Sequence, residues 1–401
     1  MMVINAPRWI APLIVLAISL ALPASAQEQL WKELNEKVVA LYEQGRFGEA
    51  SKVAQEALKV AEDTFGPDDP AVATALNNLA GLYQAQERYA EAEPLYQRAL
   101  GIREKALGAD HPDVATLLNN LAELYRAEGK YAVAEPLYKR ALAIDEQALG
   151  KDDPGVATDL NNLALLYFAQ GKYAEAKPLY QRALAIWEKT RGRNDPQVAS
   201  ALNNLAELYR AQAKYAEAEP LYRRALRIWE RSLGRNHPQV ATVLNNLAEL
   251  YRLQGNHAEA EMSYKSALAI MEKTLGPDDP DVAALLNNLA GVYKAQGKYA
   301  EAEAGYQRAL EIVTKRLGPD HPFVAASLTN LAGVYEAEGK YGKAEPRYQQ
   351  ALRIVKKTLG PEHPKVAAVL ENMAQFYKKA GKPEEAEKLE KQARAIRSKS
   401  Q

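Results

Sequence analysis

Adjacent asparagines recur along the chain at a constant spacing, and their amides are suited to binding another polypeptide. One series, with a period of 42 residues, consists of Asn78, Asn120, Asn162, Asn204, Asn246, Asn288 and Asn330, and is continued by Asn372. The series directly before it consists of Asn77, Asn119, Asn161, Asn203, Asn245 and Asn287. Because an asparagine amide both donates and accepts hydrogen bonds, it can pair with a peptide group whatever side chain that group carries. The two series therefore indicate a surface that holds a peptide backbone. The alternative is that these amides bond neighbouring helices of the chain itself.

Charged residues accompany the asparagines in three of the repeats. Glutamate and arginine stand three residues apart in the pairs Glu123 and Arg126, Glu207 and Arg210, and Glu249 and Arg252. At this spacing the two side chains share one face of a helix and can pair, which contributes about 0.2–0.5 kcal/mol. We count the three arginines among the candidate binding residues, with a solvated ion pair as the alternative. In three other repeats glycine replaces the glutamate, at Gly81, Gly291 and Gly333. This leaves room either for a ligand or for a close helix contact.

The histidines are the next candidates for chemistry, since histidine serves both as a general base and as a metal ligand. Four of them directly precede proline: His111, His237, His321 and His363. Aspartate takes the same place in other repeats, at Asp69, Asp153, Asp195 and Asp279. Interchange with aspartate is typical of a helix N-cap. Histidines two or three repeats apart are separated by roughly 20–30 Å, too far to share one zinc ion. We therefore predict capping for them.

The rest of the sequence gives no reason to expect an enzyme. It contains no cysteine, and no glycine-rich phosphate loop, serine–histidine–aspartate set or pair of carboxylates stands out from the repeats. We therefore expect no catalytic residue, no metal and no cofactor. The 51 basic and 51 acidic residues balance each other, so the chain has no overall charge that favours nucleic acid or a membrane surface as a partner.

The spacing of apolar residues predicts two helices in each repeat. In the first of them Asp69 is a suitable N-cap, and Pro70 suits the first helical turn. The apolar residues up to Tyr83 then fall on one face of a helix. After a short polar segment a second helix runs from Tyr89 to the residue before Gly108, which is suited to end it.

The order of residues within the repeat resembles the tetratricopeptide repeat, in the 42-residue form of kinesin light chains. The consensus strings that carry this resemblance are Leu-Asn-Asn-Leu-Ala, Gly-Lys-Tyr-Ala-Glu-Ala-Glu-Pro-Leu-Tyr and Leu-Gly-x-x-His-Pro. The resemblance covers essentially all of residues 30–398. The resemblance implies an all-α solenoid of about nine antiparallel helix pairs wound into a right-handed superhelix. It also implies that the first helices line the concave surface, so that the asparagines lie in a groove.

Nine helix pairs are expected within residues 27–401. Their second helices begin near Phe47, Tyr89, Tyr131, Tyr173, Tyr215, His257, Tyr299, Tyr341 and Pro383. The end pairs depart from the consensus, as capping repeats do. The first helix of the array is expected at about residues 31–44, out of register by about one residue, and in the last pair Glu390 replaces the packing tyrosine.

Residues 1–26 have the three-part pattern of a secretory signal peptide. Arg8 precedes an apolar run of 14 residues, 9–22, and the small residues 24–26 close the segment. The run is shorter than the roughly 20 residues that span a bilayer as a helix. We expect cleavage after Ala26 and a mature protein that begins at Gln27 in the periplasm or outside the cell. Retention of the segment as an anchor is the alternative.

These features together predict a non-enzymatic scaffold for a protein or peptide partner. Repeats stack about 10 Å apart, and an extended chain advances about 3.3 Å per residue. A peptide or flexible partner segment in the groove would therefore meet one asparagine at about every third residue. We expect the protein to be a monomer. The alternative is a structural or regulatory subunit of an envelope assembly or secretion machine that acts through its end repeats.

Overall fold

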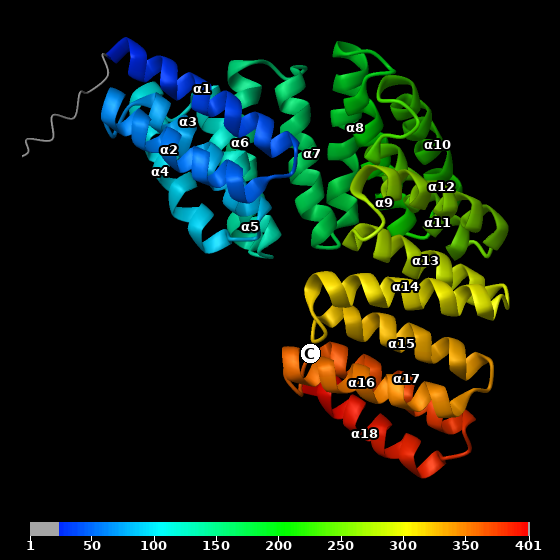
Figure 1. Ribbon diagram of the computed structural model, residues 1–401. Coiled ribbons are helices and arrows are strands. Elements are labelled where there is room, and N and C mark those ends of the chain that lie inside the picture. The colour runs from blue at the N-terminus through cyan, green and yellow to red at the C-terminus, as the bar shows by residue number, and fades with distance from the viewer. Residues whose placement is uncertain (1–23, 400–401) are drawn as a thin grey trace, which may run out of the picture. The chain divides into compact units, whose positions relative to one another are not determined.

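The structure is a computed structural model and describes residues 24–399 (Figure 1). Within this range the chain forms eighteen helices and no strand, and consecutive helices pack as antiparallel pairs. The predicted all-α array of helix pairs is therefore confirmed. The chain divides into two compact units, residues 1–151 and 152–401, and each is described by itself. The predicted signal segment lies mostly outside the described residues.

Unit 1 contains three helix pairs. They are α1 (Ala24–Glu43) with α2 (Phe47–Phe65), α3 (Pro70–Ala85) with α4 (Tyr89–Leu107), and α5 (Pro112–Ala127) with α6 (Tyr131–Ala148). The second helix of one pair also packs on the first helix of the next, as α2 does on α3 and α4 on α5. The stacking is thus continuous within the unit.

Unit 2 contains six pairs with the same arrangement (Figure 1). Their first helices are α7 (Pro154–Ala169), α9 (Pro196–Ala211), α11 (Pro238–Leu253), α13 (Pro280–Ala295), α15 (Pro322–Ala337) and α17 (Pro364–Lys379). Their second helices are α8 (Tyr173–Thr190), α10 (Tyr215–Ser232), α12 (His257–Leu275), α14 (Tyr299–Leu317), α16 (Tyr341–Leu359) and α18 (Pro383–Lys399). All nine predicted starts of second helices agree with the structure. None of the described helices combines the length and the apolar character needed to cross a membrane.

From α3 onward the first helices begin where the sequence predicts, because a side chain caps each start. The carboxylate of Asp69 accepts a hydrogen bond from the backbone N–H of Ala71 at 2.8 Å. In the same way Nδ1 of His237 accepts from the N–H of Gln239 at 3.2 Å. The other histidines that precede proline, His111, His321 and His363, make the same contact. Their predicted capping role is confirmed.

Small residues allow the two helices of a pair to approach closely. Ala80 on α3 and Ala92 on α4 have no exposed surface, and Tyr96 fills the adjoining space with 3% of its surface exposed. In unit 2 the equivalent Ala164 and Ala176 belong to one apolar cluster. This alternation of small and large residues repeats from pair to pair and forms the core.

The first helix of the array differs from the expectation. It begins at Ala24, seven residues before the expected start at residue 31, and it ends at Glu43. No proline or glycine interrupts residues 24–43, so nothing in this segment breaks a helix. The helix is also in register with the other repeats. Asn35 lies in the place of Asn77, and its side chain accepts a hydrogen bond from Asn78.

The capping contact gives a direct test of these helix starts. Replacing His237 by alanine removes the acceptor at the start of α11 and should lower the free energy of unfolding by about 0.5–2 kcal/mol. Replacement by aspartate should preserve stability, because aspartate makes the same contact at Asp195. Urea denaturation followed by circular dichroism measures both variants. Equal destabilisation by alanine and by aspartate would contradict the capping role.

Candidate functional site

The first helices of each unit form one face. In unit 1, α3 contacts α5, and in unit 2 each first helix from α7 to α15 contacts the next first helix. A hydrogen bond between Asn78 and Asn35 adds α1 to this set. We call the surface formed by α1, α3 and α5 in unit 1, and by α7, α9, α11, α13, α15 and α17 in unit 2, the first-helix face.

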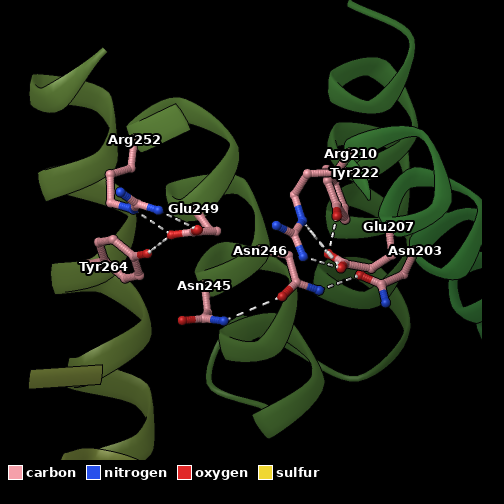
Figure 2. Close-up of polar contacts among 9 residues, drawn as sticks. All are labelled: Asn203, Glu207, Arg210, Tyr222, Asn245, Asn246, Glu249, Arg252 and Tyr264. Atoms are coloured by element: carbon pink, nitrogen blue, oxygen red, sulfur yellow. Dashed lines mark hydrogen bonds and ion pairs between the residues drawn. The ribbon is translucent and has the colours of Figure 1, made fainter. Parts of the chain in front are cut away.

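The asparagines of the first-helix face bond one another across neighbouring repeats, in an arrangement that we call the asparagine ladder. In unit 1 the Nδ2 atoms of Asn78 and Asn120 donate to Oδ1 of Asn35 and Asn77 at 3.1 and 2.8 Å. In unit 2 the Nδ2 atoms of Asn204, Asn246 and Asn288 donate to Oδ1 of Asn161, Asn203 and Asn245 at 2.9, 3.0 and 3.3 Å. Asn245 also donates to Asn246 at 3.3 Å (Figure 2). Hydrogen bonds between helices, the alternative role considered for these residues, are thus present. A binding role for them stays a prediction.

The ladder is interrupted within unit 2, and two asparagines lie beyond it. At α15 threonine replaces asparagine, and the Thr329 hydroxyl donates to the carbonyl of Ala325 at 2.8 Å. Asn287 turns instead to the Ser327 hydroxyl at 3.3 Å. Asn330 and Asn372 are exposed and make no hydrogen bond with the described residues. Asn119 and Asn162 are half-buried on α5 and α7.

The three predicted glutamate–arginine pairs are present, and each includes a tyrosine that the sequence did not indicate. Arg252 binds Glu249 through two nitrogens, both at 2.7 Å, and the Tyr264 hydroxyl of α12 donates to the same carboxylate at 3.0 Å (Figure 2). The Tyr138 hydroxyl donates to Glu123 at 2.8 Å, with Arg126 on the same carboxylate. The third cluster contains Glu207, Arg210 and Tyr222. Each cluster joins the two helices of one pair.

The surroundings of these clusters raise the pKa of their tyrosines and lower that of Glu249. Burial, followed by the charge of the adjacent glutamate, raises the pKa of Tyr138, Tyr222 and Tyr264. Burial also tends to raise the pKa of Glu249, but its hydrogen bonds with Arg252 and Tyr264 outweigh burial, and the net pKa is lowered. The three tyrosines therefore remain neutral hydrogen-bond donors near neutral pH.

Where glycine replaces the glutamate, the tyrosine hydroxyl finds another acceptor in two repeats but not in the third. Tyr96 donates to Gln84 and Tyr348 donates to Glu336, both at 2.9 Å. In the repeat of Gly291 the corresponding side chain is Lys294, which has no acceptor to offer. The Tyr306 hydroxyl oxygen lies 3.4 Å from the position that a Cβ atom would occupy at residue 291. It makes no hydrogen bond with the described residues, and burial raises its pKa to about 12.

Two adjoining hollows occupy the first-helix face of unit 2. The larger, about 530 Å³, lies over Gly291 and is lined by Arg252, Tyr306 and Asn330. The smaller, about 270 Å³, lies nearer the starts of α11 and α13. Asn245 and Asn288 line both hollows. In unit 1 a hollow of about 320 Å³ lies over Gly81 and is lined by the half-exposed Val39 and Tyr42. The three positions at which glycine replaces glutamate were visible in the sequence. Of these, Gly81 and Gly291 line the hollows described here, and Gly333 does not.

Stacked helix pairs with one polar face of first helices define a helical-repeat protein. Seven overlapping segments match the tetratricopeptide repeat: residues 33–105, 71–147, 113–189, 155–228, 197–273, 281–357 and 324–399. The chain belongs to the tetratricopeptide repeat family. No curated protein matches its sequence.

Several solved structures are similar to this chain. BtubC (BKLC) from P. vanneervenii is 30% identical over 58% of this chain and 92% of that chain, with a TM-score of 0.50. A putative kinesin light chain of Podosopora anserina with nearly identical TPR-like repeats is 25% identical over 52% of this chain and 98% of that chain, with a TM-score of 0.43. A Rap protein complexed with competence and sporulation factor is 16% identical over 94% of this chain and 99% of that chain, with a TM-score of 0.57. The predicted resemblance to kinesin light chain repeats is confirmed.

The tyrosine at the centre of each cluster gives a matched pair of variants. Replacing Tyr222 by phenylalanine deprives the Glu207 carboxylate of one buried donor and should cost about 1–3 kcal/mol of stability. The same replacement of Tyr306 removes a hydroxyl that has no acceptor among the described residues, so its cost should be much smaller. Thermal denaturation of the two variants measures the difference. Equal losses would show that the hydroxyl bond to Glu207 does not stabilise the pair.

Proposed function

We propose that the protein is a non-enzymatic scaffold that binds an extended peptide, or a flexible segment of a protein partner, along the first-helix face of unit 2. The observation that carries the proposal is the pair of adjoining hollows on α11 and α13, which share Asn245 and Asn288. A chain lying across both hollows would cross successive first helices. Tetratricopeptide repeats commonly serve as scaffolds for protein interactions, which supports this class of function.

The asparagine ladder supports the proposal because it orients the side-chain amides and still leaves some of their donors and acceptors free for a ligand. An asparagine side chain has two N–H donors and an oxygen with two lone pairs. Asn246 uses one donor toward Asn203, and its oxygen accepts from Asn245. One N–H and one lone pair remain for a bound backbone. The internal bonds fix the rotamers in advance, which reduces the entropy lost when a ligand binds.

The clusters of Glu207 and Glu249 support binding in a different way. Because Arg210 and Arg252 are held by carboxylates and each carboxylate also accepts from a tyrosine, these charges are fixed in place. Both arginines and Glu249 line the larger hollow. A ligand there would meet rigid charges of both signs, a condition that favours selectivity.

Asn330 offers the sharpest test of the binding face because it stands outside the ladder. It lines the larger hollow, is exposed and bonds no described residue, so its loss should not affect the fold. A peptide selected from a random twelve-residue library displayed on phage should bind the Asn330→Ala variant about two- to tenfold more weakly than the wild type, as expected for one hydrogen bond. Isothermal titration calorimetry measures the change.

Asn372 provides the matched control. It is also exposed, at the equivalent position of α17, and it lines neither hollow. The Asn372→Ala variant should bind the selected peptide as the wild type does. If both variants bind normally, the peptide does not lie along this part of the face. If no peptide can be selected at all, the proposed function itself is wrong.

We also propose that the protein is exported through its N-terminal segment. Cleavage after Ala26 would remove only the first three residues of α1 and keep Leu34, Val38 and Leu41, which are buried in the core. Such cleavage would therefore leave the buried residues of α1 in place. N-terminal sequencing of the native protein should give Gln27 as the first residue. A soluble protein in the cytosol that retains Met1 would contradict export.

A further inference from the structure

A half-buried guanidinium links three helices in unit 1. Nη1 of Arg103, on α4, lies 3.2 Å from Oδ2 of Asp113, in the first turn of α5. Nη2 of the same arginine donates to the Thr74 hydroxyl of α3 at 2.8 Å. Only 19% of the Arg103 side chain is exposed. One planar fork of donors thus satisfies a carboxylate and a hydroxyl on two neighbouring first helices.

The same acceptors recur in unit 2 without the arginine. Four repeats further along the chain, Thr242 and Asp281 take the places of Thr74 and Asp113, but Met271 takes the place of Arg103. The Thr242 hydroxyl has the orientation of its counterpart, since both donate at 3.2 Å to the carbonyl of the proline four residues before them. The other described first helices carry no acid at the position of Asp281. Apart from α5 and α13, they have Gln29, Ala71, Gly155, Gln197, Gln239, Phe323 and Lys365.

The smaller hollow of unit 2 lies at this place. Thr242, Met271 and Asp281 line it, and Asn245 and Asn288 connect it to the larger hollow. The Asp281 carboxylate makes no hydrogen bond or ion pair with the described residues. Asp281 is exposed overall, but partial desolvation of its carboxylate, followed by the charge of Asp279, raises its pKa, as expected for a carboxylate that lacks a cation. The hollow therefore has the acceptors of the unit 1 contact and open space where the guanidinium would lie.

We propose that this hollow binds an arginine side chain of the peptide that lies on the first-helix face, with Asp281 and Thr242 as its acceptors. This inference rests on the proposed function and adds to it the class of side chain that the ligand must carry. The unit 1 contact identifies arginine rather than lysine. Two separate nitrogens of Arg103 reach two acceptors there, and a compact ammonium lacks that fixed fork of donors.

Selection of peptides on the full-length protein tests the proposal. Peptides recovered from the random twelve-residue phage library should share one arginine. Replacing it by glutamine in the synthetic peptide should weaken binding to the wild type about 10- to 100-fold, because hydrogen bonds to charged groups are at the strong end of the range. Replacing it by lysine should restore only part of the affinity. Isothermal titration calorimetry measures all three peptides.

Variants of the protein identify the hollow as the place of binding. Asp281→Asn should weaken binding of the arginine peptide as strongly as replacing that arginine by glutamine does. Because both changes remove the same contact, combining them should weaken binding little further. Asp113→Asn is the matched control. It alters the same residue type at the same helical position, but its carboxylate already holds Arg103, so affinity should not change. Met271→Arg supplies the chain's own guanidinium and should abolish the preference for the arginine peptide over the glutamine peptide.

The outcomes separate this inference from the proposed function. The arginine site would be overturned if the selected peptides bind but share no arginine. It would also be overturned if an arginine peptide binds Asp281→Asn as tightly as the wild type. Either result would leave the proposed peptide-binding face intact. Equal affinity for lysine and arginine peptides would overturn the two-acceptor geometry. Failure to select any peptide would instead count against the proposed function. Circular dichroism checks that each variant is folded. Because Asp281→Asn alters an exposed side chain, it should fold even if Met271→Arg does not, and the test can rest on Asp281→Asn alone.

Discussion

The structure depends on the close contact between the two helices of each pair. That contact is made by alanines with no exposed surface, such as Ala122 with Ala134 and Ala206 with Ala218. A larger side chain at these positions would separate the helices and disrupt the tyrosine that packs beside them. One pair still exposes apolar surface on both of its sides, so it is stable only when further pairs cover it. The apolar positions are therefore nearly invariant from repeat to repeat, whereas single positions of the first-helix face differ, as at Gly81, Gly291 and Gly333.

Most of the fold could be predicted because its determinants are local. Proline with a preceding aspartate or histidine marks each first helix, and positive φ at residues such as Gly108 (89°) marks the end of a second helix. The exception at α1 has the same origin. The start of α1 lacks the aspartate–proline or histidine–proline pair that marks the other first helices, so the periodic pattern alone placed it too late. The division into two units at residue 151 has no comparable signal in the sequence.

The polar contacts of the candidate site were less predictable because they join residues from different helices. Glu207 and Arg210 share a helix, and their pairing followed from spacing alone. Tyr222 lies on the next helix, and its hydroxyl reaches Glu207 only because of how α9 and α10 cross. Asn35 could have been found by extending the 42-residue period backwards. The open place beside Asp281 required the contact in unit 1, since nothing in the sequence associates Arg103 with Thr74 and Asp113.

The hydrogen bonds between repeats also bear on the order in which the chain folds. The contacts of the asparagine ladder join residues that are 43 positions apart, and those between a helix pair and the preceding turn, such as Lys105 with Asp68, join residues 37 apart. Each repeat thus needs only the one before it in order to complete its contacts. Chains whose contacts are this local fold quickly for their size, and a repeat array can propagate structure from any formed pair. The N-terminal pairs can therefore acquire their final structure while the C-terminal half of the chain is still being synthesised.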